Sequence, residues 1–173
     1  MKLAYVMTGE RGETDLLLSH FAQACLERGL SVAGLVQTNT ETAVAHHCDM
    51  DVQVLPDGPV LRISQSLGTG AQGCRLDSSV LETAVGEVEK TLATRPALVI
   101  LNKFGKQEAD GGGFRELIGT CLADGIPVIT GVNAMNHPAF EVFSAGLATR
   151  LAATAEALDD WARAALAGDA DAA

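Results

Sequence analysis

Two polar side chains, Asn102 and Lys103, directly follow the apolar run Ala97–Leu101. The amide of Asn102 can both donate and accept hydrogen bonds, and the ammonium of Lys103 is a compact positive charge that suits an anion. Lys106 adds a second ammonium three residues later. The five residues after the apolar run contain no carboxylate, the group that usually holds magnesium and directs water in phosphate hydrolysis. The segment therefore predicts an anion-binding site and identifies no catalytic residue.

A second anion-binding segment is predicted around a glycine-rich run. Arg62-Ile63-Ser64-Gln65 precedes this run, and Gly73-Cys74-Arg75-Leu76-Asp77 ends it. Arginine forks match tetrahedral oxyanions, and glycines let backbone N–H groups approach a ligand closely. The alternative is a surface loop in which Arg75 pairs with Asp77. The ligand-binding candidates are Arg62, Ser64, Gln65, Gly68, Gly70, Gly73, Cys74, Arg75, Asn102, Lys103 and Lys106.

The turn after the first apolar run is a candidate phosphate site. Thr8, Gly9, Gly12 and Thr14 lie between a predicted strand and a predicted helix, where backbone N–H groups can bind phosphate. However, Glu13 stands where a phosphate-binding turn of the GxxxxGK[ST] type carries lysine, and an acid there repels a triphosphate. We expect a degenerate or structural turn.

His46, His47 and Cys48 form a third candidate, a metal site. Their side chains suit zinc or a soft metal, but adjacent ligands rarely converge on one ion, so a polar loop is the competing interpretation. Cys74 is a long-range partner for Cys48 in this hypothesis. The four cysteines are expected to be free thiols, with Cys25 and Cys121 at core positions of helices. 

The composition limits the functions that are open to the protein. The 173 residues carry a net charge of −10, which disfavours binding to nucleic acid or anionic lipid. Seven of the twelve basic residues nevertheless lie between Arg62 and Arg115, which predicts a basic pocket for a small anionic ligand. No apolar run reaches the roughly 18 residues of a membrane span, and no signal segment is recognisable, so we expect a cytoplasmic protein.

Strand and helix patterns alternate along the chain, which predicts one α/β domain over residues 1–168 and a flexible tail over 169–173. The expected strands are Leu3–Met7, Ser31–Gln37, Ala97–Leu101 and Ile126–Thr130. The last two are nearly all apolar, which is typical of a parallel sheet covered on both faces. We therefore expect a three-layer, mainly parallel sheet. Val52–Leu55 and Leu61–Gln65, separated by a turn at Pro56–Pro59, predict a small inserted hairpin. The segment Thr38–Asp49 between them and the second strand is expected to be a loop.

Four helices are predicted. The first is capped by Thr14 or Asp15 and ends near Arg28, and the second begins at a capping box of Ser79 and Glu82. The other two are predicted over 114–122 and over Phe140–Leu166, with a break near Gly146. The last of these could be core or a homodimer face.

On these segments the chain resembles a bacterial family catalogued as domain of unknown function 2478. The motifs that carry the resemblance are Gly34-Leu35-Val36-Gln37, Cys48-Asp49-Met50-Asp51, Arg62-Ile63-Ser64-Gln65, Gly73-Cys74-Arg75-Leu76-Asp77 and Leu101-Asn102-Lys103-Phe104-Gly105-Lys106-Gln107-Glu108-Ala109. More distantly, it is similar to small nucleoside triphosphatases whose second motif reads Asp-Glu-x-Gly-Lys-x-Glu. In Asn102–Glu108 the Gly-Lys-x-Glu half is present and the Asp-Glu half is replaced. The resemblance implies a P-loop-like fold, and the association of the wider family with molybdenum-related genes makes molybdate or tungstate a candidate ligand.

The main hypothesis is a non-hydrolytic protein that binds a phosphate-like oxyanion, either a nucleotide or a molybdate-type anion. The first alternative is a divergent magnesium-dependent triphosphatase, with Glu108 or Asp110 for the metal and Lys106 for the γ-phosphate. The second is a metal- or thiol-based sensor that uses the His46–Cys48 segment and Cys74. 

Overall fold

The structure, a computed structural model, describes residues 2–10, 12–41, 48–65 and 76–167; within these ranges it does not describe the side chains of residues 39–41, 48 and 49. Along the chain the elements are β1 (Leu3–Val6), α1 (Glu13–Glu27), β2 (Val32–Glu41), β3 (Cys48–Leu55), β4 (Val60–Arg62), α2 (Ser78–Leu92), β5 (Leu98–Phe104), α3 (Lys106–Ala109), α4 (Arg115–Ala123), β6 (Val128–Val132), α5 (His137–Ser144), β7 (Thr149–Leu151) and α6 (Ala155–Ala167).

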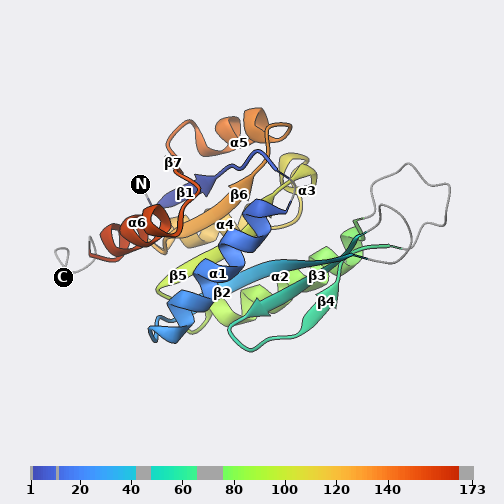
Figure 1. Ribbon diagram of the computed structural model, residues 1–173, viewed down its shortest axis with the longest axis horizontal. Helices are drawn as coiled ribbons and strands as arrows, with labels where there is room; N and C mark the ends of the chain where they lie inside the picture. Colours follow the sequence, from blue (N-terminus) through green and yellow to red (C-terminus); the bar gives the residue numbers. More distant parts are fainter. Residues whose placement is uncertain (1, 11, 42–47, 66–75, 168–173) are drawn as a thin grey trace.

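One seven-stranded sheet organises the molecule, in the order β4-β3-β2-β5-β6-β1-β7. The strands from β2 to β7 in this order run parallel, while β3 and β4 join as antiparallel strands at one edge. The helices α1 and α6 cover one face, and α2, α4 and α5 cover the other (Figure 1). This is the three-layer, P-loop-like α/β fold that the sequence predicts, with its hairpin at the β4 edge.

The central strands are apolar because both of their faces are covered. All four residues of β1 and all five of β6 are buried, as are the first five of β5. Phe140 and Leu158 are fully buried in the two core layers, one on each face, which assigns these two residues of the C-terminal segment to the core. None of the described helices is long and apolar enough to cross a membrane.

The first strand of the hairpin is longer, and the second shorter, than the sequence predicts. Val52–Leu55 does pair with a following strand, but β3 begins at Cys48 and also pairs along its length with β2, which continues to Glu41. The expected loop over Thr38–Asp49 is therefore wrong at both of its ends, because antiparallel pairing gives polar residues the backbone partners that a loop would lack. The second hairpin strand ends at Arg62 rather than Gln65, and Ser64 then forms an isolated bridge with Leu76.

The C-terminal region holds a strand where one broken helix was expected. The break near Gly146 is confirmed, since α5 ends at Ser144 and both Ala145 and Gly146 have left-handed φ angles of 52° and 68°. The chain then adds β7 beside β1 before α6 begins. The three residues of β7 are exposed or half-buried, so they show no apolar pattern that would predict an edge strand.

Two helices begin at residues other than those expected. For α2 the cap is Asp77, whose Oδ1 accepts hydrogen bonds from the backbone N–H groups of Ser79 and Val80, so the predicted capping box of Ser79 and Glu82 is wrong. For α1 the cap is Gly12, with a left-handed φ of 85° and no side-chain hydrogen bond. Asp15, an expected cap, lies inside the first turn and is buried.

Candidate functional site

A pocket of about 350 Å³ lies beside the carboxyl ends of β1, β5 and β6. In open α/β sheets this is the edge at which ligands bind. Its lining comes from the turn after β1, the start of α1, the middle of β2, the start of β3, the end of β5, the end of β6 and the segment after β6. The lining residues are Thr8, Gly9, Glu10, Gly12, Thr14, Asp15, Gln37, Met50, Lys103, Gly131, Val132, Asn133 and Ala134.

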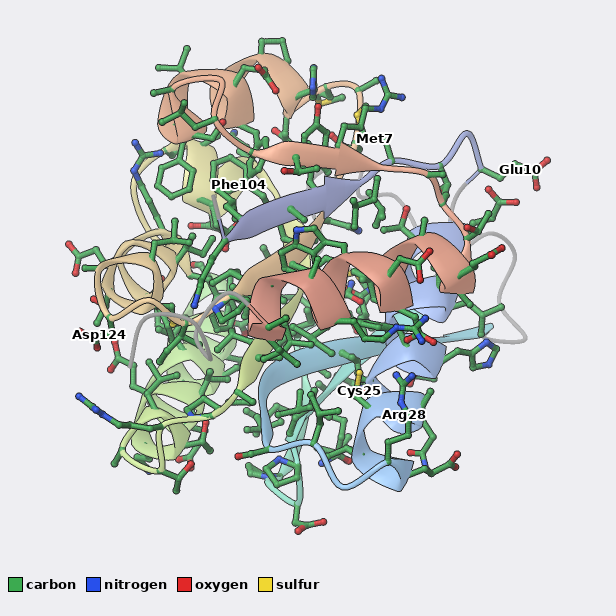
Figure 2. All side chains as sticks on the ribbon, turned by 90° about the vertical axis from the view of Figure 1, so that its left-hand side faces the viewer. Met7, Glu10, Cys25, Arg28, Phe104 and Asp124 are labelled. Carbon is green, nitrogen blue, oxygen red and sulfur yellow. The ribbon has the colours of Figure 1, made fainter. Side chains whose placement is uncertain are left out.

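The turn after β1 forms one wall of the pocket. The hydroxyl oxygens of Thr8 and Thr14 are hydrogen-bonded across 2.8 Å, which joins the two ends of the turn. Glu10 lies at the outer tip and points away from the body of the protein (Figure 2). Because no side chain caps α1, its first backbone N–H groups face this end of the sheet, where a helix N-terminus favours negative charge.

Asn102 holds the base of the site together. Its Oδ1 accepts a hydrogen bond from the backbone N–H of Gln37 at 3.1 Å, and its Nδ2 donates to Asp15 Oδ1 at 2.8 Å and to Gln37 Oε1 at 3.4 Å. All three residues are buried. Since a backbone N–H can only donate, it fixes the orientation of the Asn102 amide, and Asp15 must accept. Asn102 thus positions its neighbours and does not itself line the pocket.

Lys103 brings positive charge to the pocket. Its Nζ lies 3.9 Å from Asp15 Oδ1, and the side chain is 43% exposed. The pairing of β5 with β6 shifts register between Leu101 and Phe104, so β5 is irregular at this point and regular strand alternation is interrupted. Lys103 and Asn102 therefore both reach Asp15, and Lys103 is accessible while Asn102 and Phe104 are buried. Among the described residues that line the pocket, Lys103 is the one cation, and Glu10 and Asp15 are the acids.

Gly131 allows the wall and the base to approach each other. A Cβ at this position would lie 2.6 Å from the backbone oxygen of Asn102 and would also press against the methyl group of Thr14. The glycine therefore lets α1 begin directly against β5 and β6. Nothing in the sequence around Gly131 distinguishes it from an ordinary strand glycine.

The loop after β5 is organised by Glu108, away from the pocket lining. The Glu108 carboxylate accepts hydrogen bonds from the backbone N–H groups of Gly105 at 2.8 Å and Phe114 at 3.1 Å. It is buried, and this burial raises the pKa of the Glu108 carboxyl above its ordinary value. Glu108, the last residue of the Gly-Lys-x-Glu pattern, thus stabilises the loop. Lys106, the lysine of the same pattern, is an exposed residue at the start of α3.

Arg62, Ser64 and Gln65 lie elsewhere on this end of the sheet. Arg62 pairs with Asp51 through Nε at 2.9 Å and Nη2 at 3.2 Å, and it is three strands from Lys103, about 14 Å at ordinary strand spacing. Ser64 Oγ accepts from the backbone N–H of Met50, and Gln65 donates to the carbonyl of Leu76. The described basic residues therefore do not form the single basic pocket that their sequence spacing suggests.

Several predicted residues lie outside the described part of the chain: Gly68, Gly70, Gly73, Cys74, Arg75, His46 and His47. Cys48 is described only as the first backbone position of β3. Within residues 2–10, 12–41, 48–65 and 76–167 no group of three or more His, Cys, Asp or Glu side chains is arranged to hold a metal ion. The metal-site hypothesis for His46, His47 and Cys48 thus stays a prediction.

Sequence reasoning missed Asp15 and Gln37 as site residues. In the sequence, Asp15 stands one helical turn before Leu18 and Ser19, at a position typical of a helix cap. Gln37 follows an apolar run, and the strand continues beyond it. The available signal for Gln37 was that the apolar runs of β2 and β5 each end in a polar residue, and these ends meet at the same edge of the sheet. 

Comparison with known proteins identifies a family and a curated relative of this chain. The chain is 33% identical over 162 residues to the molybdenum import ATP-binding protein ModC 2 of Bradyrhizobium diazoefficiens, which covers 94% of this chain. It spans only 18% of the length of that relative. No solved structure matches. The family described as "Protein of unknown function (DUF2478)" matches residues 3–161, nearly the whole described structure, so the chain belongs to the DUF2478 family.

Proposed function

We propose that this protein binds a phosphate-like oxyanion in the pocket between the turn after β1 and Lys103. The candidates are a nucleotide phosphate and a molybdate-type anion. The observation that carries the proposal is that Lys103 and the uncapped start of α1 line the same pocket at the carboxyl edge of the sheet. A cation and a helix N-terminus together attract an anion more strongly than either does alone. The kinship with an ATP-binding protein of molybdenum import is consistent with either candidate.

The size of the pocket supports a small ligand. Its volume of about 350 Å³ lies near the lower end of the range for small-molecule sites. The hydroxyls of Thr8 and Thr14, which share one hydrogen bond with each other, and the side-chain amide of Asn133 are the neutral polar groups around it. This set suits one tetrahedral oxyanion or the phosphate end of a nucleotide. A homodimer and a cytoplasmic location stay predictions.

Isothermal titration with phosphate, molybdate, tungstate, ATP and GTP tests the proposal. Lys103→Met removes the ammonium from the pocket and should weaken the binding of the best ligand about tenfold or more, the usual effect of losing a charge-assisted hydrogen bond. Lys106→Met makes the same change of charge at an exposed position that does not line the pocket. It should change the affinity by less than about twofold.

Two results would overturn this function. One is the absence of binding heat with every anion at millimolar concentration. The other is equal weakening by the two lysine substitutions, which would mean that the protein attracts anions through its general field and holds them in no defined pocket.

A second candidate is magnesium-dependent triphosphate hydrolysis, and the position of Asp15 favours it. The Thr14 hydroxyl and the Asp15 carboxylate line the pocket at adjacent positions of α1, so oxygen ligands for magnesium are present there. Glu108, which the sequence offered together with Asp110 as a metal ligand under this alternative, accepts backbone hydrogen bonds within its own loop instead. Phosphate release from ATP or GTP that needs magnesium and is lost in Asp15→Asn would support hydrolysis. Release that persists in this variant would count against it.

A further inference from the structure

Asp15 places a buried carboxylate in the pocket, and the attraction of an anion by Lys103 and the start of α1 does not involve it. Asp15 is 5% exposed and lines the pocket, whereas Glu10, the other acid there, is exposed and points outward. The position of Asp15 is set from β5, because Asn102 donates to its Oδ1 at 2.8 Å and Lys103 lies 3.9 Å from the same atom. The carboxylate is thus built into the base of the site.

A carboxylate accepts hydrogen bonds and cannot donate them. A fully ionised oxyanion such as sulfate, molybdate or tungstate also only accepts, so it meets Asp15 with repulsion and with no hydrogen between the two oxygens. An oxyanion that still carries a proton can donate an O–H to the carboxylate, and such O–H···O⁻ bonds are short and strong. Because the Asp15 side chain is buried, water screens this difference less than it would at the exposed Glu10.

We propose that Asp15 makes the pocket selective for a tetrahedral oxyanion that carries a proton, hydrogen phosphate above all, over fully ionised oxyanions of similar shape. This inference rests on the proposed oxyanion function and narrows its ligand class, since it favours a protonated phosphate and disfavours the molybdate-type candidate. Lys103 and the start of α1 attract any anion, so they supply affinity. Asp15 supplies the selectivity, because its interaction with the ligand is attractive only when the ligand donates an O–H to the carboxylate.

Phosphate and sulfate provide the sharpest comparison. At about pH 8 both are tetrahedral dianions of similar size, and they differ by the single proton on phosphate. Isothermal titration of the native protein should give an affinity for phosphate at least tenfold higher than for sulfate, since the wrong ligand leaves a buried acceptor facing an acceptor. Molybdate and tungstate should bind as weakly as sulfate.

Asp15→Asn is the variant that isolates the carboxylate. Its side-chain oxygen can still accept from Asn102, so the network with β5 is retained, while its amide donates to the ligand. This variant should bind sulfate and molybdate at least tenfold more tightly than the native protein and should lose its preference for phosphate. Glu13→Gln removes an exposed acid of the first turn of α1 that does not line the pocket, and it should leave the phosphate-to-sulfate ratio within about twofold. Thermal unfolding of both variants verifies that they are folded.

A third set of titrations distinguishes free phosphate from a phosphate monoester. A monoester loses its last proton at about pH 6, so methyl phosphate and AMP should bind below that pH and weaken above it, while inorganic phosphate keeps a proton at about pH 8. If monoesters bind equally well at both values, the proton is not what the site recognises.

The outcomes separate the two proposals. Phosphate preference that disappears in Asp15→Asn supports both. Binding of sulfate or molybdate as tight as phosphate in the native protein, or a preference unchanged by Asp15→Asn, overturns the role of Asp15 and leaves oxyanion binding standing. No binding of any of these anions overturns oxyanion binding itself.

Discussion

The side-chain amide of Asn102 donates a hydrogen bond to the carboxylate of Asp15 across 2.8 Å, and this bond ties the end of β5 to the first turn of α1. The two residues are 87 positions apart in the chain, and both are buried. P-loop hydrolases carry a carboxylate at the end of such a strand. In this protein the strand β5 carries Asn102 at that place, and the carboxylate that it contacts is Asp15 of the facing helix α1. The same pair thus organises the site and leaves an acid in the pocket.

Replacing Asn102 by Asp should destabilise the protein by about 2–4 kcal/mol at neutral pH, because two buried carboxylates would face each other without a shared hydrogen. Two carboxylates in one site raise the pKa of the pair in the folded state. The stability lost by the variant is therefore largest at neutral pH and shrinks as the pH falls toward about 4, the ordinary pKa of Asp. Urea denaturation of Asn102→Asp across this range measures the effect. Asn133→Asp, at an exposed position whose Oδ1 accepts hydrogen bonds from Asn136, should show no such loss, and a pH-independent deficit in Asn102→Asp would contradict the explanation.

Replacing Glu108 by Gln should destabilise the loop after β5, since an N–H₂ group would then face the backbone N–H of Gly105 or Phe114. We expect a loss of about 1–3 kcal/mol. Burial raises the pKa of Glu108 above 4.5, so the folded state holds its proton more tightly than the unfolded chain. The stability that comes from this shift is complete below pH 4.5 and declines as the pH rises through the raised pKa.

Denaturant unfolding of the native protein and of Glu108→Gln at several pH values checks both points. The advantage of the native protein should be greatest at the acidic end and should decrease toward neutral pH. Glu116→Gln, at an exposed position in the first turn of α4, is the matched control and should change the free energy of unfolding very little. An advantage that grows with pH would show that Glu108 acts mainly as an ionised hydrogen-bond acceptor.

Replacing Gly34 by Ala should cost about 2–4 kcal/mol. Gly34 has a φ of 116°, and it pairs with Ile100 in the parallel register of β2 and β5, so that a Cβ would collide with the backbone carbonyl of Ile100. Gly119→Ala is the matched substitution, because Gly119 lies in α4 with nothing within 4 Å of its missing Cβ. It should raise stability by about 0.5–1 kcal/mol. Thermal unfolding of the two variants should therefore shift in opposite directions.

The thiol of Cys121 should resist alkylation in the native protein. Burial raises its pKa to about 11, which lowers the thiolate fraction about a hundredfold relative to an ordinary cysteine. The pKa of Cys25 is raised by burial as well, while the nearby Arg28, the residue that directly follows α1, partly offsets the effect (Figure 2). Iodoacetamide treatment followed by peptide mass spectrometry should label both cysteines slowly in buffer and rapidly in urea. Rapid native labelling of Cys121 would mean that α4 opens readily.

Apolar runs and turn residues were enough to predict the fold class. The runs at Ala97–Leu101 and Ile126–Thr130 could only be strands covered on both faces, and the turn at Pro56–Pro59 correctly marked the hairpin. Short or polar strands were not predictable: β7 has no apolar pattern, and the ends of β2 and β3 are stabilised by pairing with each other. Their hydrogen bonds depend on the neighbouring strand and leave no periodicity in the sequence.

The sequence by itself determined the α/β architecture, the edge of the sheet at which polar residues gather, and Asn102 and Lys103 as residues of that edge. Only the tertiary structure decided which of the charged residues meet. It brought Asp15 to Asn102 and Lys103, kept Arg62 with Asp51, and used Glu108 to hold its own loop. The reason is physical: strand and helix propensities act between near neighbours, whereas the partner of a charged side chain is set by strand order and helix packing across the whole sheet.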